Sequence, residues 1–272
     1  MLVLVIPCFN EAARLDLPAF TSWLRSPGND RLLFVDDGST DTTASLLEGL
    51  VDAFPQRCSL LQLSANVGKA EAVRAGLRLA LAQQASVVGY WDADLATPLT
   101  AVQDLLRVLE DSAVEVVTGA RVALVGRRIK RSLRRHYLGR VFATLAANIL
   151  DLPVYDTQCG AKLFRATPHL AAVLSQPFRC RWTFDVELLA RFMLLKRGLL
   201  SQSMVEVPLH QWTDVAGSKL GVSGIARMAL ELVDVAITYR LRRDFAPLRA
   251  PVVELQRAKS PRARARQRTA RT

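Results

Sequence analysis

The stretch Tyr90-Trp91-Asp92-Ala93-Asp94-Leu95 follows an apolar, β-prone run from Val87 to Gly89, so it predicts the end of a buried strand. Strand side chains alternate, so Asp92 and Asp94 are expected on the same side if the strand continues through them. Two carboxylates that close repel each other and favour a cation between them. Mg²⁺ or Mn²⁺ suits such oxygen ligands and also binds substrate phosphates. The alternative is a solvated acidic loop.

Length and composition predict one large α/β domain. The chain has 272 residues, and 50% of them are hydrophobic, which is enough for a sizeable core. We expect a single domain over 1–256 and a disordered tail over 257–272, where Pro, Ser and repeated Ala-Arg occur. The four cysteines are scattered and form no CxxC pair, so they indicate neither a zinc site nor a disulfide framework. A reducing cytosol fits this pattern.

Positive charge is concentrated in two segments. Eight Lys or Arg residues lie in Arg121–Arg140 and seven in Arg257–Thr272, with no acid in either. These fifteen leave 21 of the 36 basic residues for the rest of the chain, against 25 acids. The body is therefore slightly acidic and carries two basic patches, which suit phosphates, anionic lipid or nucleic acid.

No membrane-spanning or secretory segment is expected. The apolar run from Leu2 to Ile6 is too short for a signal peptide and follows no basic segment. No stretch reaches the roughly 18 uninterrupted apolar residues of a transmembrane helix. Leu220–Tyr239 comes nearest, but Arg227, Glu231 and Asp234 interrupt it.

Strands and helices alternate through the first 121 residues, which predicts a mostly parallel sheet with right-handed crossovers. Ligands bind such sheets at the carboxyl ends of the strands. Four polar clusters are expected at that edge: Pro7 to Glu11, Asp36-Asp37, Asp92/Asp94 and Arg121. The strands are expected at 2–6, 32–35, 60–63, 87–92 and 114–118.

The second half departs from this alternation. We expect helices at 132–150, 185–195 and 220–239, strands at 162–165 and 204–207, and a loop at 212–219. There is no GxGxxG after the first strand and no GxxxxGK[ST], which disfavours a Rossmann dehydrogenase or a P-loop ATPase. The three histidines are too scattered to indicate a metal site.

Four segments together resemble glycosyltransferase family 2, which has the GT-A fold, over about residues 2–240. Val5-Ile6-Pro7-Cys8-Phe9-Asn10-Glu11 is similar to the family's opening segment, and Val35-Asp36-Asp37-Gly38-Ser39-Thr40-Asp41 to its vDDGSxD loop. Asn66-Val67-Gly68-Lys69 is similar to its NxGkg turn, and Trp91-Asp92-Ala93-Asp94-Leu95 to its DaDlq metal motif. The resemblance implies a nucleotide-sugar-binding half at 1–121 and an acceptor-binding half at 122–256.

A narrower resemblance links the second half to the dolichyl-phosphate β-glucosyltransferase branch, which transfers glucose from UDP-glucose to a polyprenyl phosphate. It rests on Arg131-Ser132 and Arg135, and on Asp156-Thr157-Gln158-Cys159-Gly160-Ala161-Lys162-Leu163-Phe164, Arg181-Trp182-Thr183-Phe184-Asp185-Val186-Glu187-Leu188 and Gly217-Ser218-Lys219. Two features depart from the branch. The chain begins at its first strand, where the eukaryotic enzymes carry a membrane helix, and Gly119-Ala120-Arg121 replaces GSR.

The resemblance implies a set of site residues. The nucleotide sugar would contact Pro7, Asn10, Glu11, Asp36, Asp37, Gly68, Lys69, Asp92, Ala93 and Asp94. Asp36 would accept hydrogen bonds from the base or ribose. Asp94 would bind Mg²⁺ or Mn²⁺ directly, and Asp92 would hold a metal-bound water or the ribose. The metal would neutralise charge on the departing diphosphate.

The acceptor decides the remaining chemistry. A lipid phosphate is already ionised and needs positioning rather than a base, which Arg121, Arg131 and Arg135 would supply. A hydroxyl acceptor needs a base, for which Asp185 and Glu187 are candidates, although both also suit a helix start. Other expected acceptor contacts are Gln158, Trp212, Ser218 and Lys219; Trp212 suits core packing equally.

Two enzyme functions and one binding function remain. The first is an inverting hexosyltransferase that uses a UDP- or GDP-hexose, with UDP-glucose as the best guess, and a polyprenyl phosphate. It would be cytoplasmic and peripheral at the inner face of an anionic membrane. The second is a soluble family 2 transferase with a sugar or protein hydroxyl acceptor. The third binds RNA or another anion through the tail, but the tail lacks the aromatics that stack on bases, so no specific nucleic-acid partner is expected.

Overall fold

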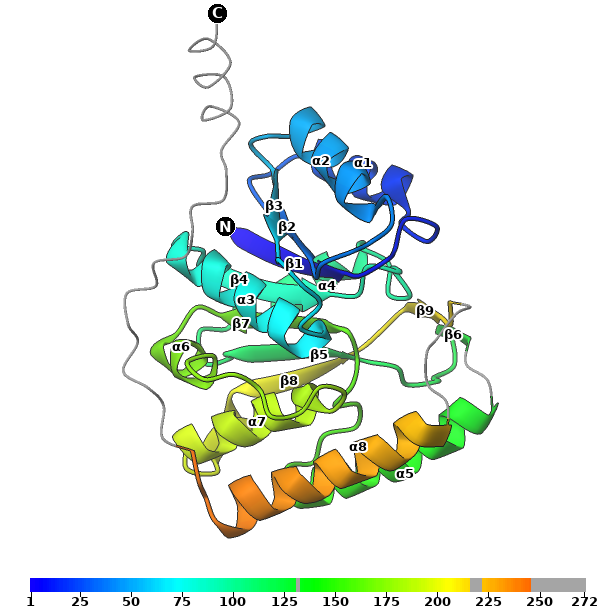
Figure 1. Cartoon of the computed structure of the whole chain (residues 1–272). Helices are drawn as coiled ribbons and strands as arrows, with labels where there is room; N and C mark the ends of the chain where they lie inside the picture. The colour runs from blue at the N-terminus through cyan, green and yellow to red at the C-terminus, as the bar shows by residue number, and fades with distance from the viewer. Residues whose placement is uncertain (131–132, 216–221, 246–272) are drawn as a thin grey trace, which may run out of the picture.

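The computed structural model describes residues 1–130, 133–215 and 222–245, and only the backbone of 133–136, 222, 223 and 225. A seven-stranded sheet runs through the described protein in the order β3-β2-β1-β4-β7-β5-β8. Figure 1 shows it at the centre, with helices on both faces. All neighbouring strands are parallel except β7, which pairs antiparallel with β4 and with β5. One strand of the second half thus lies between two strands of the first.

The central strands are buried because their sequences are continuous apolar runs, as parallel strands covered on both faces require. The seven strands are β1 Leu2–Cys8, β2 Arg31–Asp36, β3 Cys58–Gln62, β4 Val87–Trp91, β5 Val116–Ala120, β7 Ala161–Arg165 and β8 Met204–Pro208. A separate two-stranded ribbon pairs β6 Arg128–Lys130 with β9 Gln211–Thr213 in parallel.

Helices cover the sheet in two layers with separate apolar cores. On one face lie α1 Leu17–Arg25, α2 Thr43–Ala53 and α4 Ala101–Val108. On the other lie α3 Lys69–Ala82, α6 Pro168–Val173 and α7 Phe184–Leu195. A further pair, α5 Leu133–Leu150 and α8 Val222–Val235, packs outside α7, and α8 continues as the π-helix η2 Ala236–Leu241 (Figure 1). A short 3₁₀ helix, η1 Leu199–Gln202, precedes β8.

The predicted α/β fold with a mostly parallel sheet is confirmed, and all seven expected strands are present. The loop expected at 212–219 is partly wrong, because Trp212 lies in β9 and pairs with Ile129. The three-residue strands of this ribbon are too short for a periodic pattern to reveal them. The tail expected at 257–272 lies outside the described residues.

Strand β4 does not continue through Asp92 and Asp94. Strand β4 ends at Trp91, and a turn with Leu95 at φ +50° follows it. The strand alternation that was expected to bring the two side chains to one side therefore does not apply. The separation of the two acids is set by a turn.

The contact of α3 with the sheet gives a test of this packing. A Cβ on Gly76 would lie 2.4 Å from Cγ1 of Val5 and 2.8 Å from Cγ2 of Val35. We therefore expect Gly76→Ala to lower the free energy of unfolding by about 1–3 kcal/mol through overpacking, although Ala is the better helix former. Denaturant unfolding measures this. The control is Gly49→Ala in α2, where a Cβ meets nothing within 4 Å; it should stabilise by about 0.5–1 kcal/mol. Equal effects at both positions would contradict the packing.

Candidate active site

Two loops join at the carboxyl ends of β1 and β2. The backbone N–H of Asp37 donates to the carbonyl of Cys8 at 2.8 Å. The side chain of Asn10 accepts from the N–H of Thr40 at 2.8 Å, and the N–H of Glu11 donates to the hydroxyl of Thr43 at 2.8 Å. The segment from Pro7 to Glu11 and the loop after Asp36 therefore form one unit, as their places in the sequence predicted.

Asp37 holds the third loop. Its carboxylate accepts from the N–H groups of Val67 and Gly68 at 2.8 and 2.9 Å, and from the side-chain amide of Asn66 at 3.0 Å. Burial raises the pKa of Asp37, while the two backbone bonds act in the opposite direction. Gly68 has φ +94°, which favours glycine, and precedes Lys69 at the start of α3. Asp37 is thus an anchor for the turn that presents Lys69.

Asp36 lies beside it and is buried at 4% exposure. One of its oxygens accepts from the N–H of Ser39 at 3.1 Å. Ala93, between the two acids of the opening motif, is also buried. Their expected contacts with a nucleotide sugar stay predictions.

The carboxylate of Asp92 fits closely against a glycine. The N–H of Asp92 donates to the carbonyl of Gly160 at 2.9 Å. A Cβ on Gly160 would lie 1.9 Å from Oδ2 of Asp92, so only glycine leaves room for this carboxylate. The ammonium of Lys69 contacts the other oxygen, Oδ1, at 2.5 Å. The first and second halves of the chain therefore meet at Asp92.

Asp94 lies at the turn that follows. Its Oδ1 accepts from the N–H of Ala96 at 3.1 Å. Burial raises the pKa of Asp94, and the negative charge of Asp92 raises it further. The positive charges of Lys69 and Arg14 act in the opposite direction but do not outweigh these two effects.

The acid pair fits a hard divalent cation only in part. Carboxylate oxygens are its preferred donors, and the raised pKa of Asp94 marks a site where added positive charge is favourable. In the described part of the chain, no group of three or more His, Cys, Asp or Glu side chains is placed to hold a metal ion. Asp92 and Asp94 therefore fit a metal whose other ligands come from substrate phosphates and water, which is how Mg²⁺ is commonly bound.

Arg121 is held by Asp156. Its Nε and Nη2 donate to the two carboxylate oxygens at 2.6 and 2.7 Å, and its guanidinium stacks on Trp212 at 5.4 Å. Burial alone would raise the pKa of Asp156, but the Arg121 guanidinium outweighs burial and holds it below the ordinary value. Trp212 is 9% exposed, as core packing requires, and its expected acceptor contact stays a prediction.

The two acids at the start of α7 are both engaged. Asp185 accepts from the ammonium of Lys162 at 2.6 Å and from the hydroxyl of Tyr90. Glu187 is 0% exposed and accepts from two backbone N–H groups and from the side chains of Arg191 and Tyr239. Neither carboxylate lies open to abstract a proton.

The remaining expected acceptor residues are only partly described. Gln158 donates to the carbonyl of Trp182 at 3.2 Å and is half-buried. Arg131, Ser218 and Lys219 lie outside the described residues, as does the side chain of Arg135. Their roles stay predictions.

Three residues at this edge were not singled out from the sequence. Gly160 and Lys162 lie in the Asp156–Phe164 segment. Lys162 stands between Ala161 and Leu163 in an apolar strand, and this position could have indicated a buried charge. Arg181 is the third, and its Nη2 would lie 2.9 Å from a Cβ on Gly68. The Arg181 guanidinium therefore lies beside Gly68, the residue that precedes Lys69, and adds a second cation there.

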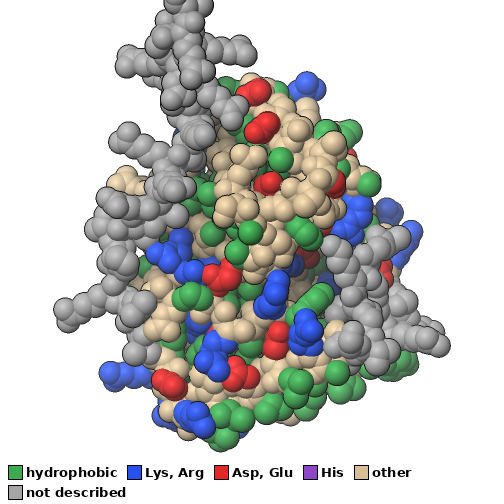
Figure 2. All heavy atoms as spheres, viewed as in Figure 1, with side chains coloured by type: hydrophobic (Ala, Val, Ile, Leu, Met, Phe, Trp, Pro, Cys, Tyr) green, Lys and Arg blue, Asp and Glu red, His purple; other side chains and the backbone are tan. Residues whose placement is uncertain are grey.

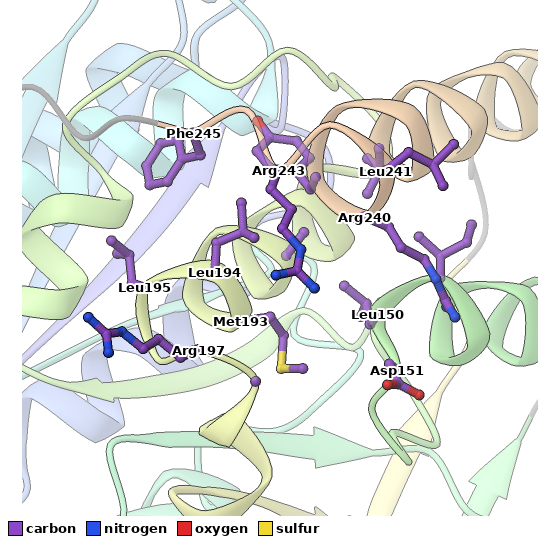
Figure 3. Close-up of a pocket in the computed structure, with 15 residues that line it drawn as sticks. Leu150, Asp151, Met193, Leu194, Leu195, Arg197, Arg240, Leu241, Arg243 and Phe245 are labelled. Carbon is purple, nitrogen blue, oxygen red and sulfur yellow. The ribbon is translucent and has the colours of Figure 1, made fainter.

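A wide cavity lies away from this edge. A cavity of about 810 Å³ opens between the C-terminal ends of α5 and α7 and η2. Figure 3 shows Leu194, Met193 and Leu150 in it, with Arg197, Arg240 and Arg243 around it. Met193 lies eight residues along α7 from Asp185, or about 12 Å at 1.5 Å per residue. We therefore place the candidate active site at the sheet edge, where the charged groups converge.

A mostly parallel sheet with an acid pair after β4, a lysine turn at α3, and Arg121 and Arg181 at the same edge is typical of a nucleotide-sugar transferase of the GT-A class. A solved structure of this class, glucosyl-3-phosphoglycerate synthase from Mycobacterium tuberculosis with Mn²⁺, UDP and its product, matches 88% of this chain and 79% of that chain. The TM-score is 0.61 at 20% identity, which is a likeness of fold.

Comparison with protein families shows which family the chain belongs to. The model of glycosyl transferase family 2 matches residues 3–170, and the chain belongs to this family. It is 32% identical to a dolichyl-phosphate β-glucosyltransferase of Dictyostelium discoideum, over 88% of this chain and 75% of the relative. It is 27% identical to a polyprenol monophosphomannose synthase of Mycolicibacterium smegmatis, over 89% of both. The expected family, the resemblance to this branch and the expectation of a glycosyltransferase are confirmed.

Asp94 gives a test that needs no substrate. Its pKa is raised in the folded state, so folding favours the protonated form and the ionised carboxylate costs stability at neutral pH. We expect Asp94→Asn to raise Tm at pH 7. The gain should shrink as pH falls towards the pKa of Asp94, because the wild-type carboxyl then becomes neutral too.

Calorimetry at several pH values measures this effect. An equal Tm of both proteins at pH 7, or a gain that grows on acidification, would contradict the described environment of Asp94. The control is Asp104→Asn, on the exposed side of α4 and paired with Arg107 at 3.1 Å; it should change Tm little.

Proposed function

We propose that this protein transfers a hexose, with glucose from UDP-glucose as the best guess, to a polyprenyl phosphate with inversion at the anomeric carbon. The similarity to dolichyl-phosphate β-glucosyltransferases and to a polyprenol monophosphomannose synthase supports the lipid phosphate as acceptor. UDP is proposed as the donor nucleotide because the branch that the second half resembles uses UDP-glucose.

The observation that carries the proposal is the absence of an open base at the start of α7. Asp185 and Glu187 are the candidate bases for a hydroxyl acceptor, and both are buried and hydrogen-bonded. A phosphate monoester is ionised at pH 7 and attacks without losing a proton to the enzyme. The protein then needs only to hold it in line with the anomeric carbon.

The donor site in this proposal is the edge formed by β1, β2 and β4. Lys69 and Arg181 supply positive charge beside the Gly68 turn, where a diphosphate would lie. Asp92 and Asp94 would hold Mg²⁺ or Mn²⁺, which supplies charge neutralisation for the leaving diphosphate. Asp37 keeps the turn in place, and the Asp156 carboxylate orients Arg121 towards the same edge.

A lipid acceptor requires the protein to reach a membrane, and α5 with α8 offers a surface. No helix in the described ranges is long and apolar enough to cross a bilayer. Large apolar side chains are nevertheless exposed on the pair, at Leu138, Val141, Leu145, Leu230, Val233, Ile237 and Leu241. Figure 2 shows hydrophobic side chains on the lower edge, where Figure 1 places these helices, with Lys and Arg nearby. We propose peripheral binding of this surface to anionic lipid on the cytoplasmic face.

Matched acceptors test the chemistry. Purified protein is incubated with UDP-glucose, other UDP-hexoses or GDP-mannose, and with either a polyprenyl phosphate or the polyprenol of the same length. We expect transfer to the phosphate alone, loss of transfer with EDTA, and a fall in kcat of orders of magnitude for Asp94→Asn. Transfer to the polyprenol, or to a soluble sugar in preference to the phosphate, would favour a hydroxyl acceptor. Full activity of Asp94→Asn without metal would exclude the acid pair from the reaction.

Vesicle flotation tests the membrane surface. Binding to anionic vesicles should exceed binding to neutral vesicles and fall in high salt, with a weaker loss on deletion of 257–272. The double variant Val141→Glu/Val233→Glu should lose binding, because it places charge on the exposed apolar faces of α5 and α8. The proposed membrane-binding role of this surface would be contradicted if wild-type protein did not bind anionic vesicles at low salt, or if the variant bound as well as wild type.

A further inference from the structure

Lys162 is the one fully buried lysine in the described part of the chain, and it lies behind the acid pair. It is 0% exposed and sits in mid-strand in β7, opposite Tyr90 of β4 and Thr118 of β5. A buried ammonium is costly unless every N–H finds a partner. A leucine or methionine would fill this position in the sheet at a lower cost in folding free energy. The buried charge therefore suggests a role other than packing.

The ammonium makes two hydrogen bonds and lies near one aromatic ring. Nζ of Lys162 lies 2.6 Å from Oδ1 of Asp185 and 2.6 Å from the carbonyl oxygen of Cys159, and 5.3 Å from the ring centroid of Tyr90. Asp185 also accepts from the hydroxyl of Tyr90. The ammonium thus joins the first turn of α7 to the residue that precedes Gly160.

Gly160 carries this connection to Asp92. Its carbonyl accepts from the N–H of Asp92 at 2.9 Å, and its Cα faces the Asp92 carboxylate so closely that a Cβ would lie 1.9 Å from Oδ2. The position of the Cys159–Gly160 backbone therefore sets the position of the Asp92 side chain. Lys162 fixes that backbone through the Cys159 carbonyl.

We infer that Lys162 is a positioning residue for the Asp92 carboxylate, acting through the Cys159 carbonyl and Gly160, and that Asp185 serves as its counter-ion rather than as a base. The inference rests on the proposed function where it concerns metal and nucleotide binding. Its structural part, the placement of Asp92, stands independently. Groups that orient a metal ligand typically contribute 10- to 100-fold in metal affinity or activity.

The experiment distinguishes a role of Lys162 in positioning Asp92 from the general effect of removing an ion pair. Lys162→Met alone would leave the buried Asp185 carboxylate without its counter-ion. The main variant is therefore Lys162→Met/Asp185→Asn, which removes both charges. Its control is Lys196→Met/Glu115→Gln, a half-buried ion pair between the end of α7 and the residue before β5, with a contact of 2.7 Å. Two quantities are measured on each folded protein: the Kd for Mn²⁺ in the presence of UDP, from the electron paramagnetic resonance signal of free Mn²⁺, and hydrogen exchange of the Asp92 amide.

We expect the Lys162→Met/Asp185→Asn protein to bind Mn²⁺ at least tenfold more weakly than wild type and to exchange the Asp92 amide faster. The control should match wild type in both, whatever its Tm. Gly160→Ala should also weaken Mn²⁺ binding, because the new methyl group displaces the Asp92 carboxylate.

Unchanged exchange of the Asp92 amide, or Mn²⁺ affinities equal in the two double variants, would overturn the inference. Wild-type protein that binds no Mn²⁺ with UDP or with GDP would contradict the metal site of the proposed function. Hydrogen exchange would still decide whether Lys162 positions Asp92.

Discussion

A single buried ammonium joins the parts of the chain that make up the site. Nζ of Lys162 binds the carboxylate of Asp185 and the carbonyl of Cys159, and so links α7, β7 and the turn at Gly160 to Asp92. The link exists because β7 inserts antiparallel between β4 and β5. This places the second half of the chain against the acid pair of the first half, and both halves contact Asp92.

Other buried or half-buried acids act on the loops in a common way, by accepting from neighbouring backbone N–H groups. Asp37 does so for Val67 and Gly68, Glu187 for Arg179 and Cys180, Glu206 for Tyr155 and Asp156, and Glu231 for the residues 181–183. Each carboxylate replaces water for two or three donors that a loop cannot satisfy by itself. Many acids of this chain therefore serve to hold loops, which leaves Asp92 and Asp94 as the acid pair at the sheet edge.

The sequence predicted the sheet and the polar clusters at its carboxyl edge, because apolar strands that end in Pro7, Asp36 or Asp92 carry a strong periodic and positional signal. It could not predict which acids are engaged. Asp185 and Glu187 look equally suited to a base or a helix start, and their ion pairs with Lys162 and Arg191 are tertiary contacts that the local sequence does not reveal. The ribbon of β6 and β9 also had no local signal, since its three-residue strands are formed by pairing across the chain. The close fit of Gly160 against Asp92 depends on the antiparallel β7, which no spacing in the sequence reveals.

A crystal structure of the protein with Mn²⁺ and UDP-glucose tests the central claim most directly. The account predicts the diphosphate beside the Gly68 turn, with the metal bound by Asp92, Asp94 or both, and with Gly160 still packed on the Asp92 carboxylate. A nucleotide bound away from the ends of β1, β2 and β4, or a metal with no contact to either acid, would contradict it.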